Sequence, residues 1–152
     1  MSDKNVRVPP RWFERLAWRA HRGLYRISRG RLGLWPPKPG KWGAFRLTTT
    51  GRRSGEPRSV ILGYFEDGPN LVTMAMNGWT AGEPMWWLNL QAHPEAKVEV
   101  KGGAFPVRAR AAEGEERERL WSRWDGIDGN LEAYEELRGR ETAIVVLEPI
   151  DA

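Results

Sequence analysis

The 152-residue sequence contains no cysteine and only two histidines, and these absences narrow the chemistry that it can perform. Without cysteine there is no disulfide, no thiolate nucleophile and no cysteine-bound metal. His21 and His93 form no cluster, so we expect no metal site, and His93, which precedes a proline, is expected to end a helix as a polar residue. The serines lack a nucleophile-elbow context. An enzyme of this composition would depend on a bound cofactor for its reactivity.

Long apolar runs are also missing from the sequence. No segment approaches the roughly 20 apolar residues that a membrane-spanning helix needs. The N-terminus lacks the apolar stretch of a signal peptide. The sequence therefore predicts a cytoplasmic protein, with peripheral contact to the inner face of the plasma membrane as an open alternative.

The net charge of +4 is distributed unevenly along the chain. Residues 1–60 contain 15 Lys and Arg against three acidic residues, whereas residues 61–152 contain 9 against 17. The first part thus carries about +12 and the rest about −8. This asymmetry predicts an anionic partner for the first part, such as a phosphate, a polyglutamate, a nucleic acid or an acidic lipid surface.

Residues 10–29 are predicted to form an amphipathic helix, with apolar side chains on one arc and arginines on the other. Packing on its own domain is the simplest interpretation, and docking on an anionic membrane or on nucleic acid are the alternatives. Residues 30–40 contain three prolines and are typical of a linker. We therefore expect residues 1–40 to form a basic helix and linker, and residues 41–152 to form a cofactor-binding domain.

The second part of the chain alternates short strand patterns with a few helical ones, which predicts a mainly β fold of the α+β class, a small barrel with flanking helices. The expected strands are 44–49, 59–65, 70–76, 98–100, 105–110 and 143–148. The expected helices are 84–92, 113–124 and 130–137.

The segment LTTTGRRSGEPR at 47–58 is a basic turn between two predicted strands. Two glycines flank Arg52, Arg53 and Ser54, and Arg58 follows. Glycine allows backbone N–H groups to approach an anion closely, and guanidinium groups bind phosphate or carboxylate oxygens with charge-assisted hydrogen bonds. On the residues alone, both an anion-binding loop and a solvated hairpin turn remain open.

A second informative segment runs from 74 to 90, where a glycine-containing loop leads into a helix that begins at Pro84. The N-terminal amides of this helix could face a ring carbonyl or a phosphate. Met85, Trp86 and Trp87 are consecutive and cannot all face the same way. Core packing is the simpler interpretation for each of them, and lining a groove is the alternative.

Together, the motifs LTTTGRRSGEPR at 47–58, PMWWLNL at 84–90 with the following His93-Pro94, and IVVLEP at 144–149 resemble the nitroreductase family of deazaflavin-dependent oxidoreductases. The resemblance implies a split β-barrel of the flavin-reductase or FMN-binding type that holds the deazaflavin coenzyme F-420 in a groove. It also implies an F-420-dependent reductase that passes a hydride to a planar organic acceptor, such as a quinone, an enone or a nitro compound.

The resemblance assigns cofactor-binding roles to residues in both segments. The implied ligands of the phosphate and oligoglutamate tail are Arg52, Arg53, Ser54 and Arg58. The residues implied to run beside the ring are Ala75, Met76, Asn77, Gly78, Pro84, Met85 and Trp86.

The sequence also departs from the family's pattern in places. Asn77 stands where the family often has lysine, and Gly63 where tyrosine is common. Tyr64 and Tyr134 are the candidate counterparts of the tyrosines around the acceptor pocket, and Tyr134 is the candidate proton donor.

Several alternatives stay open at this stage. The barrel could hold FMN or another planar cofactor, or store the deazaflavin without turnover. A nucleic-acid-binding module is disfavoured, because the charges are not interleaved with aromatic residues on strands. A homodimer is also open.

Overall fold

The computed structural model describes residues 34–76, 82–127, 131–139 and 141–150. The helix expected at 10–29 lies outside the described residues. The strands are β1 (Gly43–Thr50), β2 (Pro57–Asp67), β3 (Asn70–Met74), β4 (Glu95–Val100), β5 (Gly103–Ala111) and β6 (Ile144–Pro149). The helices are α2 (Met85–Ala92), α3 (Gly114–Ile127) and α4 (Leu131–Arg138). No helix in these ranges is long and apolar enough to cross a membrane.

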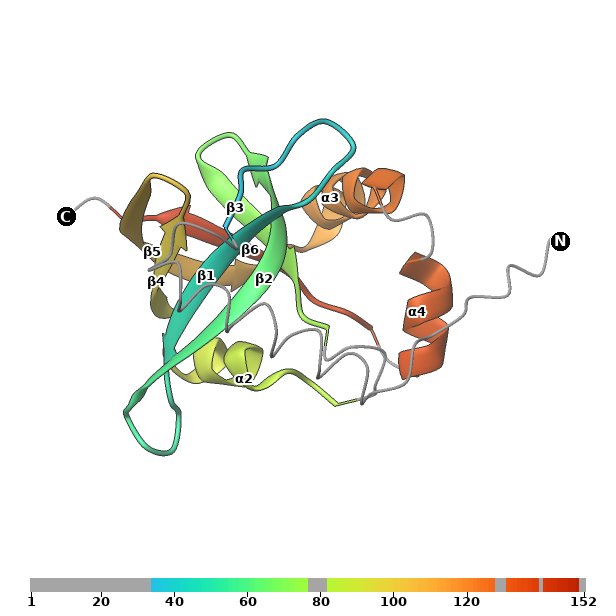
Figure 1. Cartoon of the computed structure of the whole chain (residues 1–152). Coiled ribbons are helices and arrows are strands. Elements are labelled where there is room, and N and C mark those ends of the chain that lie inside the picture. Colours follow the sequence, from blue (N-terminus) through green and yellow to red (C-terminus); the bar gives the residue numbers. More distant parts are fainter. Residues whose placement is uncertain (1–33, 77–81, 128–130, 140, 151–152) are drawn as a thin grey trace, which may run out of the picture.

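The strands form a closed antiparallel barrel in the order β1-β2-β3-β6-β5-β4, with β4 returning to pair with β1. Figure 1 shows α3 and α4 on one side of this barrel and α2 at its lower end. The predicted mainly β barrel with flanking helices is confirmed.

The barrel interior is filled by apolar side chains that alternate along the strands. In β1, Phe45 and Leu47 point inward and are completely buried, whereas Arg46 between them is partly exposed. In β6 the residues Ile144 to Leu147 are all buried, because one face of this strand meets the barrel core and the other meets a helix-covered cluster. The continuous apolar run IVVL is the pattern expected of a strand buried on both faces.

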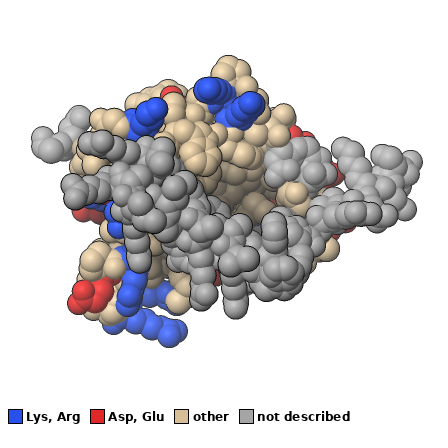
Figure 2. Space-filling model, in the orientation of Figure 1, with Lys and Arg blue, Asp and Glu red and all other residues tan. Residues whose placement is uncertain are grey.

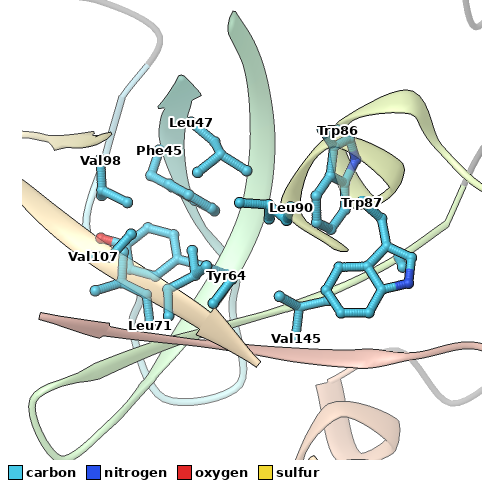
Figure 3. Packing of buried hydrophobic residues seen from close by; sticks show 13 residues of the cluster. Phe45, Leu47, Tyr64, Leu71, Trp86, Trp87, Leu90, Val98, Val107 and Val145 are labelled. Carbon is cyan, nitrogen blue, oxygen red and sulfur yellow. The ribbon is translucent and has the colours of Figure 1, made fainter. Parts of the chain in front are cut away.

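Helix α2 closes one end of the barrel with its aromatic side chains. Trp86, Trp87 and Leu90 belong to the same core cluster as the inward-facing strand residues, and the two indole rings meet edge to face at 6.4 Å. Figure 3 shows these three side chains reaching from α2 toward Leu47 and Val145. Because α2 caps the core, its position relative to the strands is fixed by burial of large apolar surfaces.

Helix α3 covers the outer face of the barrel on the side of β6. Leu120 and Trp124 are its buried residues, and the ring of Trp124 lies 3.8 Å from that of Trp42 and 5.5 Å from that of Phe65. At the β2–β3 turn, Asp67 accepts two hydrogen bonds from Arg119 of α3, at 2.8 and 2.9 Å. Apolar packing and this charged pair together fasten α3 to the barrel.

The third strand ends two residues before its predicted limit. The Ala75 N–H still donates to the Ala143 carbonyl at 2.9 Å, but the Met76 N–H turns back to the Met74 carbonyl at 2.9 Å. This local turn ends the ladder with β6 and directs the chain toward α2.

The residues that precede β1 lie against the barrel. Leu34 is buried with Ala44 and Ile61, and Trp35 forms an isolated bridge with Ala44. The division of the chain at residue 40 stays a prediction, because residues 1–33 lie outside the described part.

Candidate functional site

Strand β2 leaves its neighbour β3 partway along the barrel. It pairs with β1 over residues 57–64, whereas it pairs with β3 only over residues 65–67. Where the strands separate, the Thr73 hydroxyl donates to the Gly63 carbonyl at 2.8 Å. The barrel is therefore split along the first half of β2.

The polar backbone of β2 faces this split. Ala44 of β1 exchanges both of its backbone hydrogen bonds with Trp35, at 2.9 and 3.3 Å, on the side away from β2. Ala44 lies opposite Gly63, so this pair and the alternate pairs along the ladder are of the non-hydrogen-bonded kind. The N–H and C=O groups of Gly63, Ile61 and Ser59 consequently point away from β1. Ile61 is 4% exposed and the Gly63 carbonyl already accepts from Thr73, so Ser59, which is exposed, is the residue of these three whose backbone groups a ring with donors and acceptors can reach.

Apolar side chains accompany this strand edge. Val60 and Leu62 pack against the barrel core and yet remain partly exposed, whereas their partners in β1, Leu47 and Phe45, are completely buried. A polar edge beside a partly exposed apolar surface suits a planar heterocycle.

At its start, β2 runs back into the β1–β2 turn, which is held by its own hydrogen bonds. The Gly51 N–H donates to the Glu56 carbonyl, and the Gly55 N–H donates to the Gly51 carbonyl, both at 2.8 Å. Gly55 has a φ of 72°, in the left-handed region that favours glycine. The Ser54 hydroxyl accepts from the Glu56 N–H at 3.1 Å and makes no hydrogen bond as a donor to any described residue.

Gly51 is required by close contacts inside the turn. A Cβ atom at this position would lie 2.6 Å from Ser54 Oγ and 3.1 Å from the Glu56 carbonyl oxygen. The Ser54 hydroxyl is thus held over the backbone of Gly51, at the surface of the turn.

Arg52 ties the turn to helix α2. Its backbone N–H and its guanidinium both donate to the side-chain oxygen of Asn89, at 3.1 and 3.2 Å. The same guanidinium lies 3.9 Å from the sulfur of Met85. The segments 47–58 and 84–90, which carry much of the family resemblance, therefore meet at this junction.

Asn89 organises this junction from a buried position. It is 4% exposed, and its amide donates to the Thr49 hydroxyl at 3.2 Å, which in turn donates to the Arg58 carbonyl at 3.4 Å. Sequence reasoning gave Asn89 no role. The available signal was that it is the single polar residue within the apolar run of α2 between Met85 and Leu90.

The remaining guanidinium groups of the turn face solvent. Arg58 reaches the Ser54 hydroxyl at 3.5 Å, and Arg53 makes no hydrogen bond or ion pair to any residue that the structure describes. Over the described ranges, neither these two nor Arg52 pairs with a carboxylate. Figure 2 shows Lys and Arg side chains gathered at the lower end of the molecule, where Figure 1 places this turn. The turn thus carries net positive charge, with three arginines against the single acid Glu56 and no ion pair to these arginines from the described residues.

A sequence model of the family described as F420H(2)-dependent quinone reductase matches residues 16–149. The chain belongs to this family. An F420H(2)-dependent quinone reductase of Mycobacterium tuberculosis H37Rv is 31% identical over 144 residues, which cover 90% of this chain and 95% of the relative. The resemblance inferred from the motifs is confirmed.

Two solved structures have a similar fold. One, described as an F420-H2 dependent reductase (FDR-A), is 29% identical with a TM-score of 0.62, and the match covers 69% of this chain and 93% of that chain. The other, described as a domain-swapped dimer, is 26% identical with a TM-score of 0.65, and the match covers 88% of this chain and 98% of that chain.

The ring-side residues expected from the quinone reductase family fall into two groups. Asn77 and Gly78 lie outside the described residues. Ala75 is completely buried and its N–H is bonded to the Ala143 carbonyl, and Met76 is partly buried on the cluster beneath α3. Ala75 and Met76 directly follow β3, past the point where β3 separates from β2.

The ring-side residues of α2 differ strongly in exposure. Pro84 is buried at the start of the helix, and Trp86 is 7% exposed within the barrel core. Met85 points outward with 63% exposure, beside the Arg52 guanidinium. Of these three side chains, Met85 is thus the one with a large exposed surface that a ligand could contact.

The tyrosines occupy different environments. Tyr64 is 2% exposed in the barrel core, 5.1 Å from the ring of Phe45, and burial, with the charge of Glu66, raises its pKa to about 12. The interpretation of Tyr64 as an acceptor-pocket residue is therefore wrong. Tyr134 is partly buried in α4 on the cluster that also holds Met76, and its role as proton donor stays a prediction.

His93 ends α2, as its sequence context predicts. Its N–H donates to the Asn89 carbonyl at 2.7 Å, in the last turn of the helix. Within the described ranges, no three His, Asp or Glu side chains come together in a group that could hold a metal ion.

Proposed function

We propose that this protein binds reduced coenzyme F-420 along the open edge of β2 and reduces a quinone with it. The observation that carries the proposal is continuity: the split edge of β2 runs directly into a turn whose arginines have no carboxylate partner among the described residues. The polar edges of the F-420 ring match the strand edge, and the polyanionic tail matches the turn. Membership of the F420H(2)-dependent quinone reductase family supports the same cofactor and acceptor.

The residues present fit this cofactor at both ends. The backbone groups of Ser59 suit the donors and acceptors of the ring, and the exposed guanidinium groups of Arg53 and Arg58 suit phosphate and carboxylate oxygens. The Ser54 hydroxyl adds a neutral donor in the same turn. Arg52, already bonded to Asn89, holds the turn in place and adds positive charge to it.

When bound, the coenzyme supplies a hydride, and the chain supplies position and environment. The β2 edge orients the ring, which lowers the entropic part of the barrier. Val60, Leu62 and Met85 provide apolar surface that excludes water from the reacting faces. The quinone gains a hydride and a proton and leaves as the hydroquinone, and we assign the proton to Tyr134 or to solvent.

Anaerobic turnover of purified protein tests the proposal. Reduced F-420 is mixed with a panel of quinones, enones and nitroarenes, and its oxidation is followed through the coenzyme's visible absorbance. We expect protein-dependent oxidation with quinones. Oxidation with none of the acceptors, or tighter binding of FMN than of F-420 in a fluorescence titration, would overturn the proposal.

A charge-matched pair of variants tests the binding end. R53A/R58A removes two exposed cations from the proposed tail site, and we expect the dissociation constant of F-420 to rise by roughly tenfold or more. K101A/R108A removes two exposed cations from the β4–β5 hairpin and should leave binding unchanged. Equal losses in both variants would show a general charge effect without a site.

We further propose that the protein is cytoplasmic and meets its quinone at an anionic membrane surface through residues 10–29. The support is the amphipathic arginine-rich pattern of that segment and the apolar nature of quinones. Flotation with anionic liposomes should recover the native chain and lose R15E/R19E. The control K97E/K101E changes the charge equally on the barrel and should float like the native chain.

We also propose a homodimer, because one similar structure is described as a domain-swapped dimer. Light scattering of the full chain should give twice the 17.4 kDa mass of one chain. A monomer at micromolar concentration would remove this proposal.

A further inference from the structure

A buried ion pair joins the start of α2 to the end of α4. Arg138 Nη2 lies 3.3 Å from Glu83 Oε1, and the two side chains are 0% and 16% exposed. Arg138 also donates to the Thr142 hydroxyl through its other terminal nitrogen. The guanidinium fork thus holds two partners at once, which the single nitrogen of a lysine does less well.

The pair connects segments that are distant in sequence. Glu83 directly precedes Pro84 and the exposed Met85, and it lies 55 residues before Arg138. Thr142 leads into β6, and its carbonyl accepts from Arg117 of α3 at 2.9 Å. The pair is thus a direct contact between the start of α2 and the end of α4.

Among the described residues, helix α4 also packs on the barrel, and its Glu135 carboxylate accepts from the Thr142 N–H at 3.4 Å. Leu131 is its buried apolar residue, and Tyr134 adds partial packing on the cluster that includes Met76. Leu137 is 54% exposed. Tyr134 and Arg138 are four residues apart and lie on the same face of the helix, so the ion pair fixes the face that carries Tyr134.

We propose that Glu83 and Arg138 form a positioning pair that holds α4 against the segment around Met85 and thereby sets the acceptor side of the site. This inference rests on the proposed function, because it takes the quinone to bind near the segment around Met85 and helix α4. The two charged groups are buried and act through the segments that they join. Burying a pair of charges carries a large desolvation cost, which favours a role in fixing geometry over a role in stability alone.

Steady-state kinetics of two conservative variants test the role. E83Q keeps the shape of the side chain and one acceptor oxygen but removes its charge, and R138K keeps the charge but removes the fork. We expect both to raise the KM for the quinone by roughly fivefold or more while the dissociation constant of F-420 stays within about twofold. The readout is the difference between the two constants, because general loosening of the fold would raise both the quinone KM and the dissociation constant of F-420.

Two further variants separate position from stability. E116Q weakens the ion pair of Arg110 with Glu116, which joins β5 to the first turn of α3, and should lower the unfolding temperature without changing the quinone KM. The double variant E83Q/R138M removes both buried charges, so it should recover stability relative to E83Q while the quinone KM stays high.

The outcomes distinguish this inference from the function on which it rests. Native protein that oxidises reduced F-420 with quinones, together with an unchanged quinone KM in E83Q and R138K, would overturn the positioning role alone. Equal rises in quinone KM in E116Q and E83Q would also overturn it. Native protein without turnover would overturn the proposed function and this inference together.

Discussion

The side-chain oxygen of Asn89 accepts hydrogen bonds from both the backbone N–H and the guanidinium of Arg52, at 3.1 and 3.2 Å. One buried amide thus fixes the backbone and the charge of the β1–β2 turn to a helix that caps the barrel core. Because Trp86 and Trp87 bury α2 in the barrel core, the bond to Asn89 connects the turn to a rigid part of the fold. A preorganised turn loses less entropy when it binds an anion.

Removal of this amide should loosen the turn. In N89A the Arg52 N–H loses its buried acceptor, and we expect the free energy of unfolding to fall by about 1–3 kcal/mol. The dissociation constant of F-420 should rise by roughly tenfold because the arginines lose their arrangement. N89D keeps the acceptor for Arg52 and should retain most of the binding. If N89A bound F-420 as tightly as the native chain, the turn would not depend on α2.

Two glycines with positive φ provide a matched test of the turn backbone. Gly55 in the β1–β2 turn has a φ of 72° and Gly102 in the β4–β5 turn a φ of 100°, and a Cβ at either would meet no atom within 4 Å. G55A and G102A should each cost roughly 1–2 kcal/mol of stability in denaturant titrations, from backbone strain alone. We expect a weakened affinity for F-420 in G55A only. A similar loss in both variants would show that the effect is global.

The fold was largely predictable from the sequence because its strands are short and their patterns are local. Each predicted strand and each predicted helix of the barrel domain is present, with ends that shift by a few residues. The largest differences arise where bonding partners lie far along the chain. Strand β3 ends at Met74 because the Met76 N–H turns back to the Met74 carbonyl once the Ala75 N–H has met the Ala143 carbonyl, and no local pattern in 70–76 records the contact with Ala143.

The charged residues of the proposed site could be recognised in the sequence, but their geometry could not. Glycines and arginines mark the turn at 51–58 through local chemistry, whereas the roles of Asn89 and the Glu83–Arg138 pair depend on contacts between residues 37 and 55 positions apart. The interpretation of Tyr64 as an acceptor-pocket residue failed for the same reason. Its inward orientation follows from the register of β2 with β1, which the sequence does not state.

The ion pair between Asp67 and Arg119 predicts a loss of stability in acid. The hydrogen bond from Arg119 lowers the pKa of Asp67, and its charge and that of Arg123 act in the same direction. A carboxyl group whose pKa is lower in the folded state stabilises the fold at pH values above the pKa that it has in the unfolded chain. This contribution is lost as the pH falls below about 4. Thermal unfolding over this range should show a shallower acid dependence in D67N. Identical slopes in D67N and the native chain would exclude Asp67 as a contributor.

The two tyrosines predict different responses to loss of their hydroxyl groups. Tyr64 is buried in the core with a pKa of about 12, so Y64F should leave the quinone kcat and its pH profile unchanged up to about pH 10. Y134F removes the proposed proton donor of α4, and we expect kcat to fall by roughly tenfold or more while the dissociation constant of F-420 is unchanged. A solvent isotope effect measured on kcat should change in Y134F alone, because it reports the proton-transfer step. If Y134F matched the native kcat and isotope effect, the proton would come from solvent, and α4 would shape the acceptor site without taking part in the chemistry.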